Sequence, residues 1–378
     1  MKTSSRFLPS LLCVLLLPVL SAAAQDPTAI AFQRARNLQH GINTSLWFAQ
    51  MGHYSKDYLE TFTTPQDLEL IHQMGFDHIR LSIDADALEP WVYSGHPNMF
   101  LDELDRAVHT ALADHLSVII DIHPSDEFKA TLFQGSDGVY RFIALWHALA
   151  AHYAPLDPDH IFFEILNEPE QSDPYRWMGI QATIASVIRQ AAPQNTIIAT
   201  AAHYSGIPDL LQLEPLSDPN VIYTFHDYEP FPFTHQGATW TLPQSRYEHG
   251  IPYPSTPENV APELSEEPTL AGQLFVDQYG WDRWDAARVD DYVGYANKWA
   301  QLHHVPVYCG EFGSYGLVAP PASRVQWIHD MRVALEKYNI GWAMWDYQTP
   351  FGVVSKSNGT TTPNLDVLKA LGLHAPQP

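Results

Sequence analysis

Two glutamates in this chain follow apolar runs, and either could take part in acid–base or nucleophilic chemistry. Glu168 lies in the Asn-Glu-Pro motif of residues 167–169, directly after the apolar run 161–166. Glu311 lies in the sequence CGEFG of residues 309–313, where the flanking glycines would let a ligand or a loop come close. A carboxylate at the end of a buried strand destabilises the fold unless it has a partner or a chemical role. For each glutamate, the alternative is a structural ion pair with an arginine.

Two carboxyl groups that converge on one bond could cleave a glycosidic linkage. This reaction needs one carboxyl that is protonated and another that is ionised, so their surroundings must push their pKa values apart. A separation of about 5–5.5 Å gives a covalent intermediate and retention at the anomeric carbon, whereas a wider gap gives inversion. Glu168 and Glu311 are therefore the candidate catalytic pair, provided that the fold brings them together.

Short apolar runs alternate with amphipathic stretches along the chain, and these elements must position the pair. The predicted strands are 39–44, 78–83, 117–122, 161–166, 196–200, 221–226, 305–309 and 340–345. The predicted helices are 65–74, 101–115, 140–153, 176–191, 207–212, 287–304, 323–338 and 364–371. The strands are apolar on both faces, as parallel strands inside a barrel are. The succession predicts an α/β fold, a (β/α)8 TIM barrel, in which strands four and seven face each other.

An open, doubly wound sheet is the alternative α/β arrangement. Its nucleotide-binding form has a Gly-rich turn after the first strand. The segment 40–46, HGINTSL, contains no such turn. The barrel is therefore the preferred prediction.

Polar and aromatic side chains stand at the ends of further predicted strands. They are Arg80, His123, His226, Tyr228 and Trp345. Each of them alone could be structural, as a satisfied core histidine, a packing tryptophan or an arginine paired with Glu164. A buried arginine in particular needs an anionic partner. Their convergence on the active-site end of one barrel favours a common site.

This set of residues makes the chain resemble glycoside hydrolase family 5. The resemblance extends from the segment 40–43 (HGIN) to Trp345 and covers nearly the whole chain after its N-terminal region. The Asn-Glu-Pro motif is shared by a wider clan of barrels, while the His-x-Tyr motif at 226–228 and Arg80 narrow the resemblance to this family.

The resemblance implies a role for each matching residue. Glu168 would be the general acid/base of a double displacement, and Glu311 would be its nucleophile. Arg80 and Tyr228 would donate hydrogen bonds to the nucleophile, and His226 would lie near the acid/base.

The resemblance also implies a set of sugar contacts and no cofactor. Asn167 and His123 would bind hydroxyls of the sugar on the non-reducing side of the cleaved bond, and Trp345 would form the stacking floor of that subsite. We also expect Trp47, His203, Tyr204 and Trp240 to contact substrate as walls of the cleft.

The segment 229–236 and Trp240 resemble a stretch of certain bacterial endo-β-1,4-glucanases, so a cellulase-like endo-β-1,4-glucanase is the preferred expectation. Several alternatives stay open. The chain could be a mannanase, a xyloglucanase, an exo-acting β-glucosidase or a transglycosylase of the same family, or a glycan-binding barrel without catalysis.

The composition is strongly acidic, which limits the partners of the protein. Lys and Arg number 20 and Asp and Glu number 43, giving a formal net charge of −23. Such a surface repels nucleic acids and anionic membranes, whereas a neutral polysaccharide or oligosaccharide is indifferent to it. The 19 histidines are scattered without metal-ligand spacing, so no metal site is expected. Oligomeric state cannot be read from the sequence.

The N-terminal region has the pattern of a secretory signal peptide. A basic start, an apolar run at 11–20 and small residues at 22–24 predict residues 1–24 as the signal, with cleavage after Ala24. We expect a secreted or periplasmic protein whose residues 25–378 form one catalytic barrel domain. After cleavage Cys309 is alone, so no internal disulfide is expected. The segment 227–285, rich in Pro, aromatic and acidic residues, reads as a long loop insertion that shapes the cleft.

Overall fold

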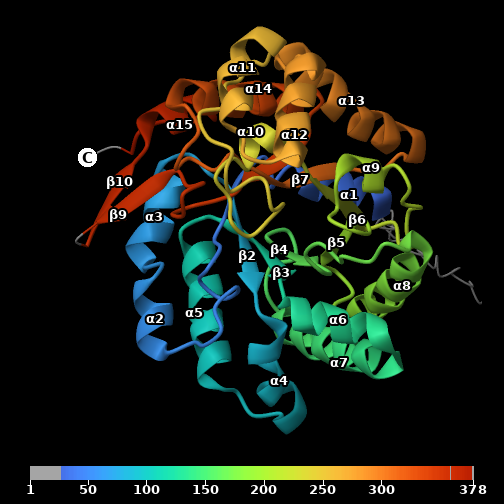
Figure 1. Ribbon diagram of the computed structural model, residues 1–378. Helices are drawn as coiled ribbons and strands as arrows, with labels where there is room; N and C mark the ends of the chain where they lie inside the picture. The colour runs from blue at the N-terminus through green and yellow to red at the C-terminus, as the bar shows by residue number, and fades with distance from the viewer. Residues whose placement is uncertain (1–26, 358, 377–378) are drawn as a thin grey trace, which may run out of the picture.

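Eight parallel strands close into a barrel, which is surrounded by helices (Figure 1). The structure, a computed structural model, describes residues 27–357 and 359–376, so the predicted signal peptide lies outside the described residues. The barrel strands are β1 (His40–Asn43), β2 (His78–Ile83), β3 (Ser117–Ile122), β4 (Ile161–Glu164), β5 (Thr196–Thr200), β6 (Val221–His226), β7 (Val307–Phe312) and β8 (Gly341–Met344). Because β8 pairs with β1, the sheet has no free edge. The predicted (β/α)8 barrel is confirmed.

Alternation along the strands decides which residues point into the barrel. One layer of the interior is an apolar cluster made of Leu38, Ile119, Phe162, Ile198, Ile222, Tyr308 and Ala343. Because side chains alternate with a period of two, Asp121 and Glu164 lie on the same inner face as Ile119 and Phe162, one layer nearer the carboxyl ends. The barrel interior is thus apolar toward the amino ends of the strands and polar toward their carboxyl ends. Active sites of this fold lie at the carboxyl ends.

Every helix of the described residues except α1 follows a barrel strand along the chain. In chain order the helices are α1 (Pro27–Ala35), α2 (Lys56–Thr61), α3 (Pro65–Gln73), α4 (Ala85–Ser94), α5 (Met99–Ala113), α6 (Asp126–Gln134), α7 (Ser136–Tyr153), α8 (Pro174–Ala191), α9 (Ile207–Leu210), α10 (Phe231–Thr234), α11 (Pro257–Glu266), α12 (Leu270–Asp282), α13 (Ala286–His303), α14 (Pro321–Lys337) and α15 (Leu365–Ala370). Helix starts carry the expected signals: Thr64 forms a capping box at α3, and Asp173 caps α8 ahead of Pro174. No helix of the described residues has the length and hydropathy needed to cross a membrane.

The predicted element bounds hold best where apolar runs are sharply delimited. The bounds of β2, β3, β5 and β6 agree with the prediction, whereas β7 begins at Val307 and continues to Phe312. Glu311 therefore lies within a strand, not after it. The chain also forms a hairpin of β9 (Val354–Ser357) and β10 (Thr360–Pro363) that the sequence did not predict.

β4 and β7 lie across the barrel from each other, as expected, three strands apart in a closed sheet of eight. Around the closed barrel they are separated by β5 and β6. Their carboxyl ends can still meet because an eight-stranded barrel is only wide enough for side chains to fill.

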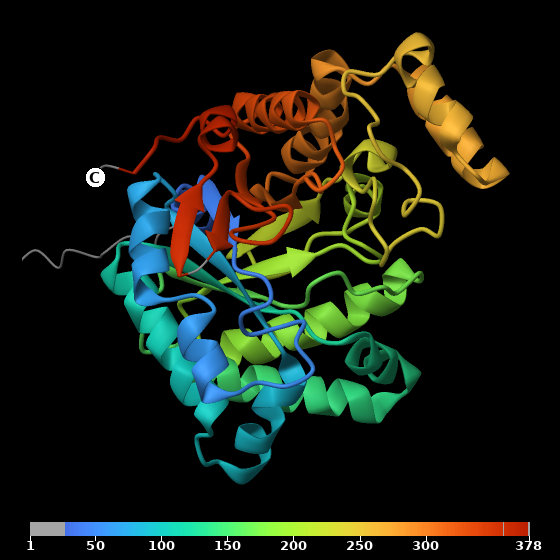
Figure 2. The same ribbon diagram turned by 60° about the vertical axis from the view of Figure 1, so that its left-hand side comes forward.

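The segment 227–285 is more regular than its composition suggested. It contains α10, α11 and α12, and α11 packs against α12. In Figure 2 this helical pair, in yellow and orange, stands out from the body of the barrel.

Candidate active site

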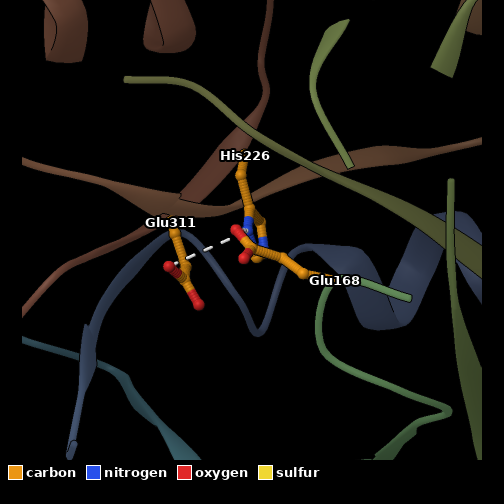
Figure 3. Close-up of side chains that lie close together, drawn as sticks. All are labelled: Glu168, His226 and Glu311. Atoms are coloured by element: carbon orange, nitrogen blue, oxygen red, sulfur yellow. Dashed lines mark hydrogen bonds and ion pairs between the residues drawn. The ribbon is translucent and has the colours of Figure 1, made fainter. Parts of the chain in front are cut away.

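Two carboxylates meet at the carboxyl end of the barrel. Oxygen atoms of Glu168 and Glu311 lie within 4.8 Å of each other, together with a ring nitrogen of His226. Figure 3 shows the two side chains approaching from opposite sides beside the imidazole. The Glu168 side chain is 24% exposed and that of Glu311 is 5% exposed, so the pair is reached from the Glu168 side. The predicted pair is therefore brought together, at a spacing that a single sugar linkage could fill.

Arg80 joins Glu311 to the structural core of the barrel. The side chain is fully buried on β2, and its five N–H groups make five hydrogen bonds. These run to Glu164 (two, 2.7 and 2.8 Å), Glu311 Oε1 (2.8 Å), Asn43 (2.9 Å) and Asn167 (2.9 Å). The structural pairing with Glu164 and the contact with Glu311 thus exist together.

The second oxygen of Glu311 has its own donor. The Tyr228 hydroxyl donates to Oε2 at 2.8 Å, so both oxygens of this carboxylate accept hydrogen bonds. His226 Nδ1 lies 2.8 Å from Glu168 Oε1 and 3.7 Å from Glu311 Oε2. This imidazole therefore separates the two carboxylates on one side and bonds directly to Glu168.

The two glycines that flank Glu311 let neighbouring segments pack closely against this part of the chain, as their positions in the sequence predicted. A Cβ at Gly310 would lie 2.6 Å from Thr224 Oγ1 on β6 and 3.3 Å from the His226 ring. A Cβ at Gly313 would lie 2.4 Å from the backbone oxygen of Trp345. Only glycine lets the strand that carries Glu311 pack this closely.

A second group of polar residues lies beside the carboxylate pair. His123 follows β3 and contacts the Asn167 amide at 3.2 Å through Nε2 and Asp121 at 3.1 Å through Nδ1. The His123 ring stacks on Trp345, with ring centroids 5.7 Å apart and planes 23° apart. These predicted residues are therefore fixed next to the pair.

Electrostatics distinguishes the two carboxyls. Burial raises the pKa of both Glu168 and Glu311. On Glu311 this rise is opposed by the positive charge of Arg80 and by the Tyr228 hydrogen bond. Because two adjacent carboxylates resist losing both protons, Glu311, which accepts from the charged Arg80 and from the Tyr228 hydroxyl, ionises first and Glu168 keeps the proton.

Burial also sets the charge of the neighbouring groups. It lowers the pKa of His226 and, well below its usual range, that of His123, so both imidazoles are neutral. Burial raises the pKa of Asp121 to about 6 even though Arg80 opposes this rise. The guanidinium of Arg80 is therefore the one charged donor that directly bonds the pair.

Glu168, His226 and Glu311 each offer one ligand atom at a spacing that a metal ion could use. Their partners do not suit a cation. Both oxygens of Glu311 already accept hydrogen bonds, and a metal ion there would face the positive charge of Arg80. The donor set fits a carboxyl pair better than a metal centre.

The expected cleft walls divide into rim residues and one core residue. Trp240 is 57% exposed and makes an edge contact with Tyr315, four residues after Glu311. His203 and Tyr204 are also exposed, beyond the end of β5. The prediction for Trp47 was wrong. Its ring is 2% exposed and its Nε1 donates to the Leu59 carbonyl oxygen, so no face of the ring is available to a sugar.

The sequence analysis missed several residues that complete the site. Asn43 binds Arg80 and Asp121 binds His123, while Lys129 forms an ion pair with Glu170 next to the Glu168 loop. A signal existed for Asp121, because it precedes His123 by two and so points to the same face. Lys129 lies on α6, which was not predicted, so its position could not be inferred.

Comparison with known proteins identifies the family of the chain. The family model for cellulase (glycosyl hydrolase family 5) matches residues 36–350. Endoglucanase C of Acetivibrio thermocellus is 30% identical over 315 residues, which cover 82% of this chain and 90% of that protein. Cellodextrinase A of Ruminococcus flavefaciens is 28% identical, with 80% and 94% covered.

Solved structures show the same relationship. Endoglucanase Cel5A of the hyperthermophile Thermotoga maritima is 28% identical, with a TM-score of 0.73 over 90% of this chain and 99% of that one. Structures of that enzyme are described in complex with cellobiose and with mannotriose. Since the family model matches most of the sequence and the barrel carries the carboxyl pair, this chain belongs to glycosyl hydrolase family 5, the cellulase family, and is a glycoside hydrolase.

Proposed function

We propose that this protein is a retaining endo-β-1,4-glucanase in which Glu311 is the nucleophile and Glu168 the general acid/base. The observation that carries the proposal is the spacing of the two carboxylates, within 4.8 Å, combined with their unequal partners. In inverting enzymes the two carboxyls are about 6.5–9.5 Å apart, which leaves room for a water molecule between them. The gap in this protein is smaller than that.

In the first step Glu311 attacks the anomeric carbon while Glu168 transfers its proton to the departing glycosidic oxygen. The bond between sugar and leaving group breaks as the glycosyl–Glu311 ester forms. Hydrogen bonds from Arg80 and Tyr228 hold the nucleophile ionised and oriented. The Glu168 proton is retained beforehand because burial raises the pKa of that carboxyl.

In the second step Glu168, now ionised, accepts a proton from water, and the water oxygen attacks the anomeric carbon. The ester bond to Glu311 breaks, and both carboxyls return to their starting states. Two inversions at one carbon give net retention. His226, whose Nδ1 lies 2.8 Å from Glu168 Oε1, orients the carboxyl that exchanges the proton.

The neighbouring residues suit a pyranose ring bound beside the pair. The amide of Asn167 and the imidazole of His123 offer polar atoms to sugar hydroxyls, and the half-buried Trp345 offers a flat face to the ring. Exposed Trp240 extends this aromatic surface toward further sugar units. The acidic surface of the protein is compatible with a neutral polysaccharide.

The β-1,4-glucan assignment rests on the relatives, which are endoglucanases and a cellodextrinase. Because the Thermotoga maritima enzyme has been crystallised with mannotriose as well as cellobiose, mannan is the second candidate substrate. The test is a panel of β-glucan, mannan, xylan and xyloglucan, with products resolved by size over time. Early release of mixed oligomers from β-glucan would support endo action, whereas release of a single short product from the outset would contradict it.

Stereochemistry and catalysis are tested in the same assay. Proton NMR of the first product should show the β anomer before mutarotation. Glu311→Gln is the control that binds substrate without turnover. An α anomer would contradict the double displacement, and a wild-type protein that releases no reducing ends from any member of the panel would contradict the enzyme assignment.

We further propose that the protein is exported after cleavage at Ala24. The support is the basic start, the apolar run and the small residues of the N-terminal sequence. Expression of the full chain in a bacterial host, followed by N-terminal sequencing of the extracytoplasmic fraction, tests this. Retention of intact Met1 in the cytoplasmic fraction would contradict the proposal.

A further inference from the structure

An ion pair between a buried lysine and a part-exposed glutamate, which the mechanism above does not use, lies next to Glu168. Lys129 on α6 is 5% exposed, and its Nζ lies 2.6 Å from Glu170 Oε1. The Lys129 side chain is 6% exposed and that of Glu170 is 32% exposed. A lysine is almost never buried to this extent without a specific partner. The pair connects the segment after β3 with the loop that carries Glu168.

The backbone of that loop needs external support. Glu168 and Glu170 have φ angles of 37° and 57°, in the left-handed region that residues with a side chain rarely adopt. The Glu170 N–H donates to the His203 carbonyl at 2.6 Å, and the His203 N–H donates to Gln171 at 3.1 Å. The segment beyond β5 therefore holds the loop on one side, and Lys129 holds it on the other.

The pair also places two opposite charges close to the Glu168 carboxyl. Lys129 lowers the pKa of Glu168, and Glu170 raises it. The other charged or titratable groups around Glu168 are Arg80 on β2, Asp121 and His123 at the end of β3, His226 and Tyr228 at the end of β6, and Glu311 on β7. Among all these groups around Glu168, including the ion pair itself, Lys129 and Arg80 are the permanent cations.

We propose that Lys129 and Glu170 are a positioning pair, which holds the Glu168 loop in its left-handed conformation and balances the charge beside the acid/base. The proposal rests on the assignment of Glu168 as general acid. Burial keeps the proton on Glu168, Lys129 opposes this effect, and Glu170 offsets part of the effect of Lys129. Removing either member leaves the other uncompensated, and the two removals act in opposite directions.

The test is the pH dependence of kcat/KM for an aryl β-cellobioside with a poor leaving group. The alkaline limb of this profile reports the loss of the acid's proton. Lys129→Met removes a cation, so the limb should move to higher pH by about 0.5 to 1 unit. Glu170→Gln removes an anion that acts more weakly on Glu168, so the limb should move to lower pH by a smaller amount, about 0.3 to 0.5 unit. Lys129→Arg keeps the charge and should restore the wild-type limb.

A second substrate separates this role from a general effect on folding. A dinitrophenyl leaving group departs without protonation, so its kcat/KM does not depend on the acid. Above the alkaline limb, Glu170→Gln should lose about two- to threefold activity on the poor leaving group and little on the activated one. The matched control is Lys337→Met, which removes a lysine from an exposed ion pair with Asp290 on another part of the surface. It should leave both profiles in place.

Several outcomes would overturn the proposal. These are an unmoved limb in folded Lys129→Met, shifts of the same sign in Lys129→Met and Glu170→Gln, or equal losses on both substrates. If Lys129→Met does not fold, the shift in Glu170→Gln and the rescue in Lys129→Arg decide the question. Failure of the proposed function looks different, because the wild-type protein itself would then not cleave the cellobiosides.

Discussion

Arg80 Nη1 lies 2.8 Å from Glu311 Oε1, while the Nε and Nη2 atoms of the same guanidinium bind Glu164. The buried guanidinium of Arg80 therefore binds both a carboxylate of the barrel core and a carboxylate of the reactive pair. Because the guanidinium is planar and its five donors are all used, the position of Glu311 is fixed by the core of the barrel. This contact links the stability of the fold to the reactivity of the site.

Removing Arg80 should destabilise the protein strongly. Arg80→Met leaves Glu164 buried without its partner, and breaking such a pair costs about 3–5 kcal/mol of unfolding free energy. Urea denaturation followed by tryptophan fluorescence measures this change. Arg141→Met, which breaks a part-exposed pair with Glu89, is the control and should cost no more than about 1 kcal/mol. Equal losses in the two variants would contradict the account of Arg80.

Glu311→Gln should remove activity and leave the fold intact. The glutamine oxygen can still accept from Arg80, and its amide can donate to the Tyr228 oxygen, but the neutral group no longer attacks the anomeric carbon. We expect kcat to fall by at least about 1,000-fold with an unchanged melting temperature. Hydrolysis of an aryl β-glycoside at a near-parental rate would remove Glu311 from the mechanism.

Tyr228→Phe should shift the acid limb of the pH profile. Tyr228 lowers the pKa of Glu311 by donating to it, so its loss lets burial raise that pKa further. The nucleophile must be ionised, and the acid limb of kcat/KM should therefore move to higher pH. At the optimum the rate should fall about 10- to 100-fold, as expected for a hydrogen bond to a charged group.

The control for this change is Tyr223→Phe, whose hydroxyl accepts from the Leu216 N–H away from the site. Its acid limb should stay in place. An acid limb that moves to lower pH in Tyr228→Phe would show that the hydroxyl does not stabilise the ionised nucleophile.

Truncation of a tryptophan to alanine should lower stability at Trp47 and weaken substrate binding at Trp240. Trp47→Ala creates a cavity in the core and should cost about 3–5 kcal/mol of stability. Trp240→Ala removes a ring that is 57% exposed, so stability should change by less than about 0.5 kcal/mol. Thermal unfolding measures the first effect, and KM on cello-oligosaccharides measures the second, which should rise. Unchanged KM values in Trp240→Ala for all chain lengths would remove Trp240 from the binding surface.

The barrel and most of its site could be predicted from local sequence signals. Strands such as β2 and β3 are apolar on both faces and sharply delimited, so their ends, and the residues at those ends, follow directly. His123 and His226 stand at such ends, Glu168 follows β4 and Arg80 lies within β2, and the fold brings the carboxyl ends of the strands together at one face.

What the sequence could not decide was set by packing between distant segments. Trp47 and Trp240 are the same residue type, yet Trp47 is buried and bound to Leu59 of α2 whereas Trp240 is exposed, because burial depends on which segments cover a ring. Lys129 and Glu170 are 41 residues apart, and only the approach of α6 to the Glu168 loop pairs them. The sequence by itself determined the order of the strands and the chemistry at their ends, since these depend on local alternation of apolar and polar residues. Only the tertiary structure decided the distances between carboxylates and the partners that tune them, because these depend on how the closed barrel brings its strand ends together.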